Sequence, residues 1–240
     1  MRKLFVHLLL ANALLWAPPG RAAPPASVEA SYELYRSNIL FVRVREIFHY
    51  GDGKYRIEST ASPAGIATWL TKDRITRLSR GTVTGDGLKP EFFEEKRISP
   101  DKERVRTAQF DWTQGKITSS YDGKSETAPL QAGTQDWLSL FYQFLFSGQF
   151  LLSAPDKDAV PIILADGKRV ETYHYRFVDE TTLTTAAGTF AALHYVDTDA
   201  KGERSTAIWL ARDKSFFLVK LVHEEDGAVL EQRLVALSFH

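Results

Sequence analysis

Two short stretches of the sequence carry residue types that could support catalysis or metal binding. In the first, Ser99 and Lys102 stand in a Ser-x-x-Lys arrangement, with which acyl-serine enzymes place a nucleophile beside an amine. The companion Ser-Asp-Asn and Lys-Thr-Gly motifs of those enzymes are absent from the sequence. Charged β-type segments also flank residues 99–102. We therefore interpret these residues as a turn.

The second stretch, from Asp197 to Gly202, resembles the beginning of a calcium-binding loop. Asp197 and Asp199 stand at the first and third positions and Gly202 at the sixth, as such a loop requires. However, Lys201 occupies the fifth, ligand-bearing position, and Ile208 stands where a bidentate glutamate belongs. The segment is therefore interpreted as a β-hairpin.

The other candidates for chemistry are isolated. Four histidines are scattered through the chain: His49, His174, His194 and His223. They show no short metal-ligand spacing, so no metal site is predicted. Adjacent acids such as Glu94 and Glu95 point to opposite faces of a strand and do not form a catalytic pair. Because zinc-protease, hydrolase, phosphate-loop and dinucleotide motifs are also absent, the sequence favours a protein without cofactor or enzymatic activity, and an enzyme is the weaker alternative.

The N-terminus has the three parts of a secretory signal peptide. Arg2 and Lys3 precede an apolar run from Leu4 to Trp16, which is too short to span a bilayer comfortably. Small residues around Arg21 predict cleavage after Ala22, with Ala23 as the alternative site. We expect residues 1–22 to be a cleavable signal peptide and the protein to be periplasmic or secreted, without an integral membrane span. The competing interpretation is an N-terminal anchor that stays attached.

The composition of the remaining chain, residues 23–240, predicts one mostly-β domain. A hydrophobic content of 44% and a charged content of 25% are ordinary for a globular protein, and no linker divides the chain. Cleavage after residue 22 removes three of the 30 basic residues and none of the 30 acidic ones, which leaves 27 basic and 30 acidic residues. The slight negative charge argues against nucleic acid as a partner. The chain has no cysteine, which excludes disulfides, thiol catalysis and lipid attachment through cysteine.

Alternation of apolar and polar residues is the commonest pattern in the chain. Tyr173, Tyr175 and Phe177, for example, alternate with His174 and Arg176, as in a half-buried strand. Glycine turns separate such runs, and roughly eleven strands joined mainly as a meander are predicted. The last four are expected at residues 190–197, 205–210, 216–223 and 228–237.

One segment, Trp137 to Leu145, is apolar nearly all round and predicts a helix. Its polar side chains recur every four positions: Ser139, Gln143 and Ser147. Asp136 or Thr134 could cap its beginning, and Gly148 could end it. A weaker helical segment is expected at residues 64–71. The predicted fold is a mainly β single domain, in which a large curled antiparallel sheet, a half-barrel or open barrel, wraps around one apolar helix.

Several short motifs follow one another in a characteristic order. They are Tyr32-Glu33-Leu34-Tyr35-Arg36, Gly53-Lys54-Tyr55-Arg56-Ile57, Ser79-Arg80-Gly81, Gly87-Leu88-Lys89-Pro90, Phe110-Asp111-Trp112, Asp136-Trp137-Leu138-Ser139, Tyr142-Gln143 and Trp209-Leu210-Ala211. In this order the sequence resembles an uncharacterised family of exported proteobacterial proteins, domain-of-unknown-function family 3108, over nearly all of residues 23–240. It departs from the family pattern at Asn38 to Val42, where bulky residues replace expected glycines. The resemblance implies export and a β-rich fold but no activity, and the expected shape also resembles the periplasmic lipoprotein-carrier half-barrels.

Two hypotheses of function follow. In the first, the protein is a non-enzymatic envelope module whose concave sheet binds an apolar ligand, such as a lipid or an acylated protein. The candidate ligand-binding residues are Trp69, Trp112, Trp137, Phe141 and Phe144, with Trp69 and Trp112 expected on inner faces. In the second, it is a structural or interaction component of the envelope that contacts a protein partner through its sheet edges or its charged outer face. The candidate contacts are then Arg43, Arg45, Arg104 and Arg106.

Overall fold

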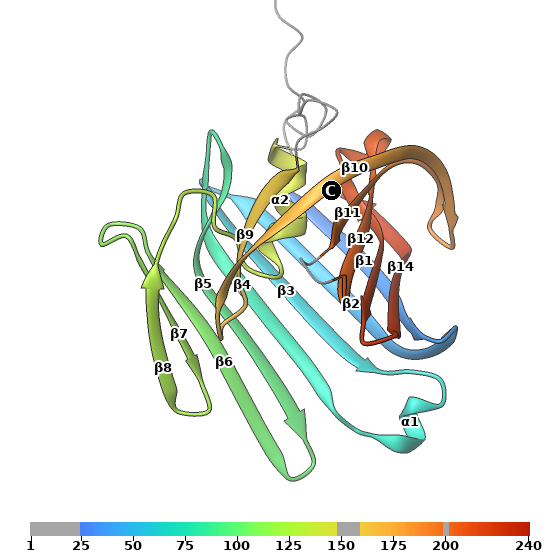
Figure 1. Ribbon diagram of the computed structural model, residues 1–240, viewed down its shortest axis with the longest axis horizontal. Helices are drawn as coiled ribbons and strands as arrows, with labels where there is room; N and C mark the ends of the chain where they lie inside the picture. Colours follow the sequence, from blue (N-terminus) through green and yellow to red (C-terminus); the bar gives the residue numbers. More distant parts are fainter. Residues whose placement is uncertain (1–24, 148–158, 199–201) are drawn as a thin grey trace, which may run out of the picture.

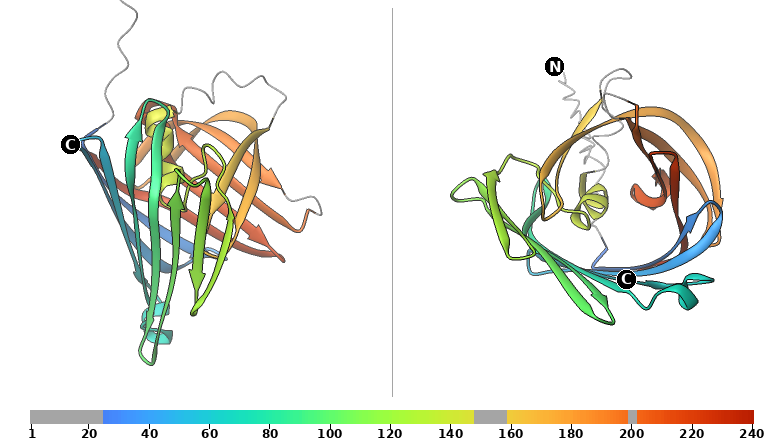
Figure 2. Two further views of the ribbon diagram at one scale, coloured as in Figure 1. Left: turned by 90° about the vertical axis from the view of Figure 1, so that its left-hand side faces the viewer. Right: turned by 60° about the horizontal axis from the view of Figure 1, so that its bottom comes forward.

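The computed structural model describes residues 25–147, 159–198 and 202–240. The predicted signal peptide, residues 1–22, lies outside these ranges, as do residues 199–201 of the segment that resembles a calcium-binding loop. Within them, fourteen strands form one antiparallel sheet that curls around a helix without closing into a barrel (Figures 1 and 2). The predicted fold class is confirmed. The strands outnumber the roughly eleven expected, because short polar strands such as Lys124–Pro129 show little apolar alternation.

The elements follow one another along the chain with these bounds: β1 (Ser27–Arg36), β2 (Ile39–Gly51), β3 (Lys54–Pro63), α1 (Ala67–Leu70), β4 (Arg74–Thr84), β5 (Gly87–Ser99), β6 (Lys102–Asp111), β7 (Lys116–Tyr121), β8 (Lys124–Pro129), α2 (Ser139–Ser147), β9 (Val160–Ala165), β10 (Val170–Thr185), β11 (Gly188–Thr198), β12 (Arg204–Ala211), the 3-10 helix η1 (Arg212–Lys214), β13 (Phe217–Glu225) and β14 (Ala228–Phe239). The last four strands include the residues predicted for them, except that β13 begins at Phe217, one residue after its predicted start.

The sheet consists of two meanders joined side by side. Strands β1 to β8 form one meander, strands β9 to β14 form the other, and β1 pairs with β14 between them. The edge strands of the sheet are therefore β8 and β9, which are neighbours in sequence, and the chain between them contains α2 and also Gln135, which forms a short parallel bridge to β9. Because this connection must cross from one edge to the other, the helix lies on the concave side of the sheet (Figure 2).

The first hairpin explains the departure from the family pattern at residues 38–42. Ser37 and Asn38 both adopt positive φ angles, 49° and 63°, which a two-residue turn between twisted strands requires. The register then shifts between Leu34 and Tyr35, and this irregularity leaves Phe41 without a partner on β1. Bulky residues are therefore accommodated by a turn in which Asn38 tolerates the left-handed conformation.

The beginning of α2 is held by Asp136, one of the two predicted caps. Its Oδ1 accepts hydrogen bonds from the backbone N–H groups of Leu138 and Ser139, each at 2.9 Å, and the Ser139 hydroxyl accepts the N–H of Asp136 at 2.9 Å. Asp136 Oδ2 accepts a further hydrogen bond of 2.6 Å from the hydroxyl of Ser79 on β4. The cap therefore also fastens the helix to the sheet.

Two polar residues of α2, Ser139 and Gln143, attach the helix to its surroundings. Ser139 is buried, and Gln143 bonds to the β4–β5 turn by donating to the Asp86 carbonyl at 2.8 Å and accepting the N–H of Leu88. Gly87 makes this approach possible, since a Cβ atom there would overlap the amide of Gln143. These two polar groups are thus used for attachment, and the apolar surface of the helix packs into the core on both sides.

Two groups of buried side chains surround α2. The larger one, with Phe48, Phe93 and Tyr142, lies between the helix and the first meander and also includes residues of β9 and of β11 to β14. The smaller one, with Leu140 and Phe144, fills the space between the helix and strands β9 to β13. Among the helices in the described ranges, none has the length and apolar character needed to cross a membrane.

Candidate functional site

Three of the five predicted ligand-binding residues lie together. Phe141 and Phe144 come from α2 and Trp137 from the turn just before it, and all three pack in the smaller core group against strands β9 to β13. Phe144 is buried, whereas Trp137 and Phe141 are half-buried. The side of α2 that faces the second meander is therefore the place to look for a ligand.

The other two predicted residues lie elsewhere. Trp112, at the end of β6, stacks on Phe110 and donates its indole N–H to the Pro90 carbonyl, away from the second meander. Trp69 lies on α1 and is 90% exposed. The expectation that Trp69 faces inward is wrong, because the apolar side of α1 projects away from the sheet: Leu70 beside it is 78% exposed.

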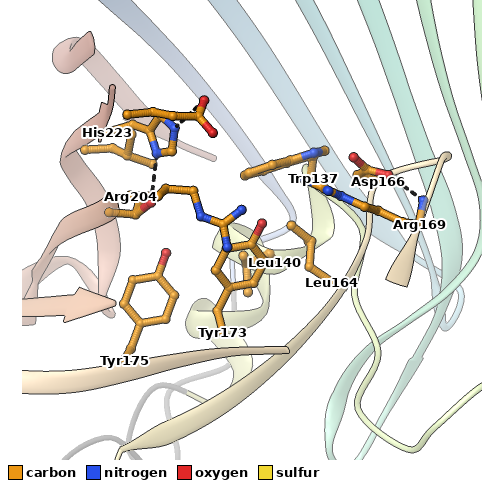
Figure 3. A pocket seen from close by; sticks show the side chains of 12 residues that line it. Trp137, Leu140, Leu164, Asp166, Arg169, Tyr173, Tyr175, Arg204 and His223 are labelled. Atoms are coloured by element: carbon orange, nitrogen blue, oxygen red, sulfur yellow. Dashed lines mark hydrogen bonds and ion pairs between the residues drawn. The ribbon is translucent and has the colours of Figure 1, made fainter. Parts of the chain in front are cut away.

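A cavity of about 250 Å³ lies between α2 and the second meander (Figure 3). We call it the α2 cavity. Its apolar and aromatic lining comes from Trp137, Leu140, Leu164, Tyr173, Tyr175 and Leu221. Its polar lining comes from Asp166, Arg169, Arg204, Thr206, His223 and Glu225. The exposed residues Arg169 and Glu225 mark the side on which it meets solvent. Thus an apolar interior adjoins a charged rim.

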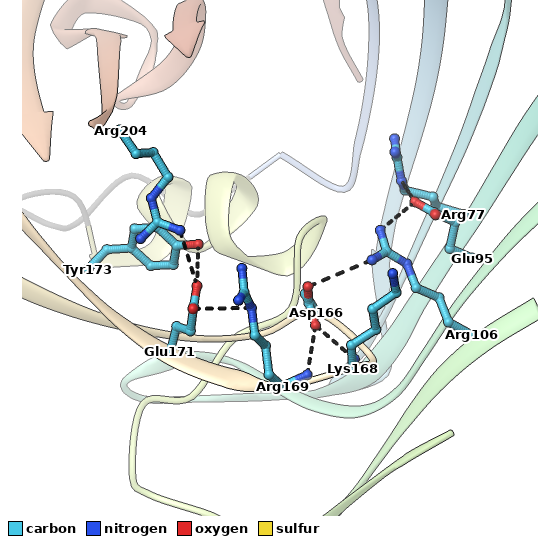
Figure 4. A network of polar contacts seen from close by, with 9 residues as sticks. All are labelled: Arg77, Glu95, Arg106, Asp166, Lys168, Arg169, Glu171, Tyr173 and Arg204. Atoms are coloured by element: carbon cyan, nitrogen blue, oxygen red, sulfur yellow. Dashed lines mark hydrogen bonds and ion pairs between the residues drawn. The ribbon is translucent and has the colours of Figure 1, made fainter. Parts of the chain in front are cut away.

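Glu171 organises part of this rim. It accepts a hydrogen bond of 3.1 Å from the Tyr173 hydroxyl and pairs with Arg169 at 3.1 Å and with Arg204 at 3.6 Å (Figure 4). The Arg204 guanidinium also lies 5.4 Å from the centre of the Tyr173 ring. These contacts hold two arginines in place at the rim of the cavity.

The two tyrosines of the cavity are neutral at physiological pH. Burial, and then the Glu171 carboxylate, raises the pKa of Tyr173 to about 12. Burial, and then Asp197, also raises the pKa of Tyr175 well above its ordinary value. Both phenols can therefore donate hydrogen bonds but are not poised to act as bases.

Thr206, His223 and Glu225 resemble in type the hydroxyl, imidazole and carboxylate of a nucleophilic site. The Thr206 hydroxyl lies 2.9 Å from His223 Nδ1. However, His223 Nε2 lies 3.8 Å from the Glu225 carboxylate, which is too long for the orienting hydrogen bond of such a site. The arrangement therefore supplies hydrogen-bonding groups for a ligand rather than an activated nucleophile.

The turn between β9 and β10 connects the two meanders. Asp166 Oδ1 accepts the N–H groups of Lys168 and Arg169 at 2.7 and 2.9 Å, and its other oxygen lies 3.7 Å from the guanidinium of Arg106 on β6. Gly167 packs against the backbone of Thr107 on the same strand. The open side of the sheet is thus bridged by an ion pair (Figure 4).

Sequence reasoning missed most of the polar residues of the site. Glu171, Arg204 and His223 come from three strands, and only the fold brings them together. The alternation of the strands could have indicated one of the polar residues. Side chains two apart in a strand point to the same face, so Thr206 lies on the inward face with the apolar residue Ile208. Within the described part of the chain, no cluster of three or more His, Cys, Asp or Glu residues could hold a metal ion.

The fold and this site define a β-barrel-like protein with an enclosed helix. A solved structure of similar shape is the β-barrel-like protein of family DUF1849 from Brucella abortus, with 13% identity, a TM-score of 0.56, and coverage of 91% of this chain and 100% of that one. A candidate lipoprotein from Parabacteroides distasonis is less similar, with 10% identity, a TM-score of 0.37, and coverage of 89% and 95%. No curated protein matches the sequence.

The family is established by sequence. The model of DUF3108, described as a protein of unknown function, matches residues 31–232. The chain therefore belongs to the DUF3108 family, and the resemblance read from its motifs is confirmed. Because the family description assigns no activity and the similarity to the Brucella protein concerns the fold alone, function must be argued from the site.

Proposed function

We propose that this chain is an exported, non-catalytic binding protein of the cell envelope that holds a lipid-like ligand in the α2 cavity. The observation that carries the proposal is the cavity itself, in which an apolar interior adjoins a charged rim. Such a combination suits a molecule with an apolar portion and a polar end. A volume of about 250 Å³ is suited to a small amphiphile or to one segment of a longer chain.

The groups of the rim support a fixed orientation of the ligand. Arg169 and Arg204 are held by Glu171, so their positions are largely set before a ligand arrives. Inside, Trp137 is half-buried and has a large apolar surface that a ligand could cover. Export rests on the N-terminal segment, whose charge, apolar run and small residues have the pattern of a signal peptide.

The test is native mass spectrometry, followed by lipid extraction, of the mature protein purified from the periplasm of its host. We expect an acyl lipid to copurify at stoichiometric ratio. Trp137→Ala should lose this ligand, because the indole forms part of the cavity wall. Trp112→Ala is the matched control, since it removes a half-buried indole outside the cavity and should retain the ligand.

Two results would contradict the proposal. The first is a ligand-free wild-type protein that also fails to bind a fluorescent fatty acid in titration. The second is an equal loss of ligand in Trp137→Ala and Trp112→Ala when both variants are equally stable. Ligand binding would then not depend on the wall of the α2 cavity.

A second candidate function is supported by α1. Ile66 just before α1 is 58% exposed, and Trp69 and Leu70 on the helix are 90% and 78% exposed. A contiguous exposed apolar patch is typical of an interaction surface. The protein would then be an interaction component of the envelope that presents α1 to a protein partner. A photocrosslinking amino acid at position 69 should give one specific adduct in cells if this is so, and none above the level of a crosslinker at the exposed position 36 if it is not.

A further inference from the structure

A second pocket, of about 270 Å³, lies on the concave face of the first meander. We call it the basic pocket. Its lining comes from Ile75, Arg77, Glu95, Arg97, Arg104, Arg106, Tyr121 and Lys168. Arg97 and Arg104 share a face with the buried residues Phe93 and Ala108 of their strands, since side chains two apart in a strand point the same way. Arg104 and Arg106 therefore do not lie on the outer face, where they were expected as contacts for a protein partner.

Positive charge exceeds negative charge in the basic pocket. Glu95 pairs with Arg77 at 2.6 Å and with Arg106 at 2.9 Å, and Asp166 approaches Arg106 from the turn (Figure 4). Burial raises the pKa of Glu95, but the two arginines outweigh it and hold that pKa below its ordinary value, so the carboxylate is charged. Five cations thus face Glu95 and Asp166, and the buried Glu46 acts on Arg77 from β2, so positive charge remains in excess.

Arg97 and Arg104 carry much of this excess. They are direct cross-strand partners on β5 and β6, a position in which like charges repel. Among the described residues, neither forms an ion pair. In the same part of the structure, the buried Nε of Arg106 has no hydrogen-bond acceptor. Repelling guanidinium groups beside an unsatisfied buried N–H form an arrangement that an anion would stabilise.

The basic pocket and the α2 cavity are close together. The turn between β9 and β10 contributes Lys168 to the basic pocket and both Asp166 and Arg169 to the α2 cavity. Lys168 Nζ also lies 4.2 Å from the centre of the Tyr121 ring, which directs the ammonium group toward β7 and away from the α2 cavity. One turn therefore separates an apolar site from a cationic one.

We propose that the basic pocket binds a phosphate-type anion through Arg97, Arg104 and Lys168, and that this anion is the headgroup of the ligand in the α2 cavity. The paired guanidinium groups match the several oxygens of a phosphate. The second half of the proposal rests on the proposed function, because it assumes that the α2 cavity holds the apolar part of the same molecule. The substrate class is then an anionic, phosphate-bearing amphiphile.

The experiment compares three probes by isothermal titration calorimetry of the mature protein: octyl phosphate, inorganic phosphate and 1-octanol. Octyl phosphate should bind more tightly than either of the others, and its affinity should fall as salt is added. The double variant R97Q/R104Q should bind octyl phosphate at least about tenfold more weakly, as expected when charge-assisted hydrogen bonds are lost. Its binding of 1-octanol should be unchanged.

The matched control is the double variant R43Q/R45Q. Arg43 and Arg45 are likewise two neighbouring arginines, but they lie on β2 with their side chains on the outer face, where they pair with Glu33 and Glu29. This variant loses the same charge and should bind octyl phosphate as the wild type does. R97Q/R104Q should also fold with an unchanged or higher unfolding midpoint, since it removes a repulsive pair. A normal midpoint excludes misfolding as the reason for weak binding.

The outcomes separate the two proposals. If octyl phosphate binds no more tightly than 1-octanol, the anion site is overturned while the apolar cavity stands. If inorganic phosphate binds as tightly as octyl phosphate and 1-octanol does not bind, the basic pocket binds a free anion, and the proposal of a lipid-like ligand is overturned. Equal losses in R97Q/R104Q and R43Q/R45Q would show a general effect of charge and would also overturn the basic pocket as the site.

Discussion

The buried carboxyl group of Asp136 predicts an unusual dependence of stability on pH. Burial raises its pKa from 3.8 to about 6, and hydrogen bonds from Ser79 and from the N–H groups of Leu138 and Ser139 only partly oppose this. The folded protein therefore binds a proton more tightly than the unfolded chain does. The contribution of this group to stability is fully present below pH 3.8 and is lost as the pH rises through about 6.

The size of the effect follows from the shift. A difference of about 2.2 pKa units corresponds to about 3 kcal/mol between the acidic and neutral limits. Asp136→Asn cannot titrate but keeps a side-chain oxygen for the cap, because Asn is as good a capping residue as Asp. Relative to the wild type, the variant should therefore gain about 3 kcal/mol in free energy of unfolding between pH 3 and pH 7.

The assay is urea denaturation of both proteins at intervals from pH 3 to pH 7. Other carboxyl groups, such as Glu231 with its pKa lowered to about 2, titrate in both proteins and cancel in the difference. A difference that stays constant with pH would refute the reasoning. A difference of opposite sign would show that the hydrogen bonds of the cap outweigh burial.

Three further substitutions test the packing. Phe144→Ala should lower the free energy of unfolding by about 3 to 5 kcal/mol in urea denaturation, because the ring is only 2% exposed in the smaller core group. A loss below about 1 kcal/mol would contradict this packing. Gly81→Ala should cost about 1 to 3 kcal/mol, since its Cβ would overlap the Lys89 carbonyl at a register shift, whereas Gly85→Ala, with open space around it, should not. Trp69→Ser should change stability by less than about 0.5 kcal/mol in thermal or urea unfolding, and a larger loss would place this indole in a contact that the fold does not show.

The sequence alone predicted the elements whose signals are local. Alternation with period two predicted inward-facing strand residues such as Tyr175, which is buried. An apolar segment with a cap predicted α2, and the capping hydrogen bonds of Asp136 depend only on the next three residues. Together these signals indicated a curled sheet around one helix.

Other features required the tertiary structure, because they depend on which strands are neighbours. The pairing of β1 with β14 joins the first and last strands of the sheet, and no local pattern encodes it. That pairing makes β8 and β9 the edge strands and sends α2 across the concave side. Trp69 also shows this limit, since an apolar side chain on a short helix faces inward only if the fold supplies a surface to cover it.

The candidate sites illustrate the same division. Trp137, Phe141 and Phe144 could be grouped from sequence because one segment of chain carries them. The charged groups around them could not be grouped from sequence. The ion pair of Arg106 with Asp166, for example, joins the two meanders through residues that are 60 positions apart in the chain. Hydrophobic periodicity reports which face of a strand is buried, but the charges that meet on that face are decided by strand order and register.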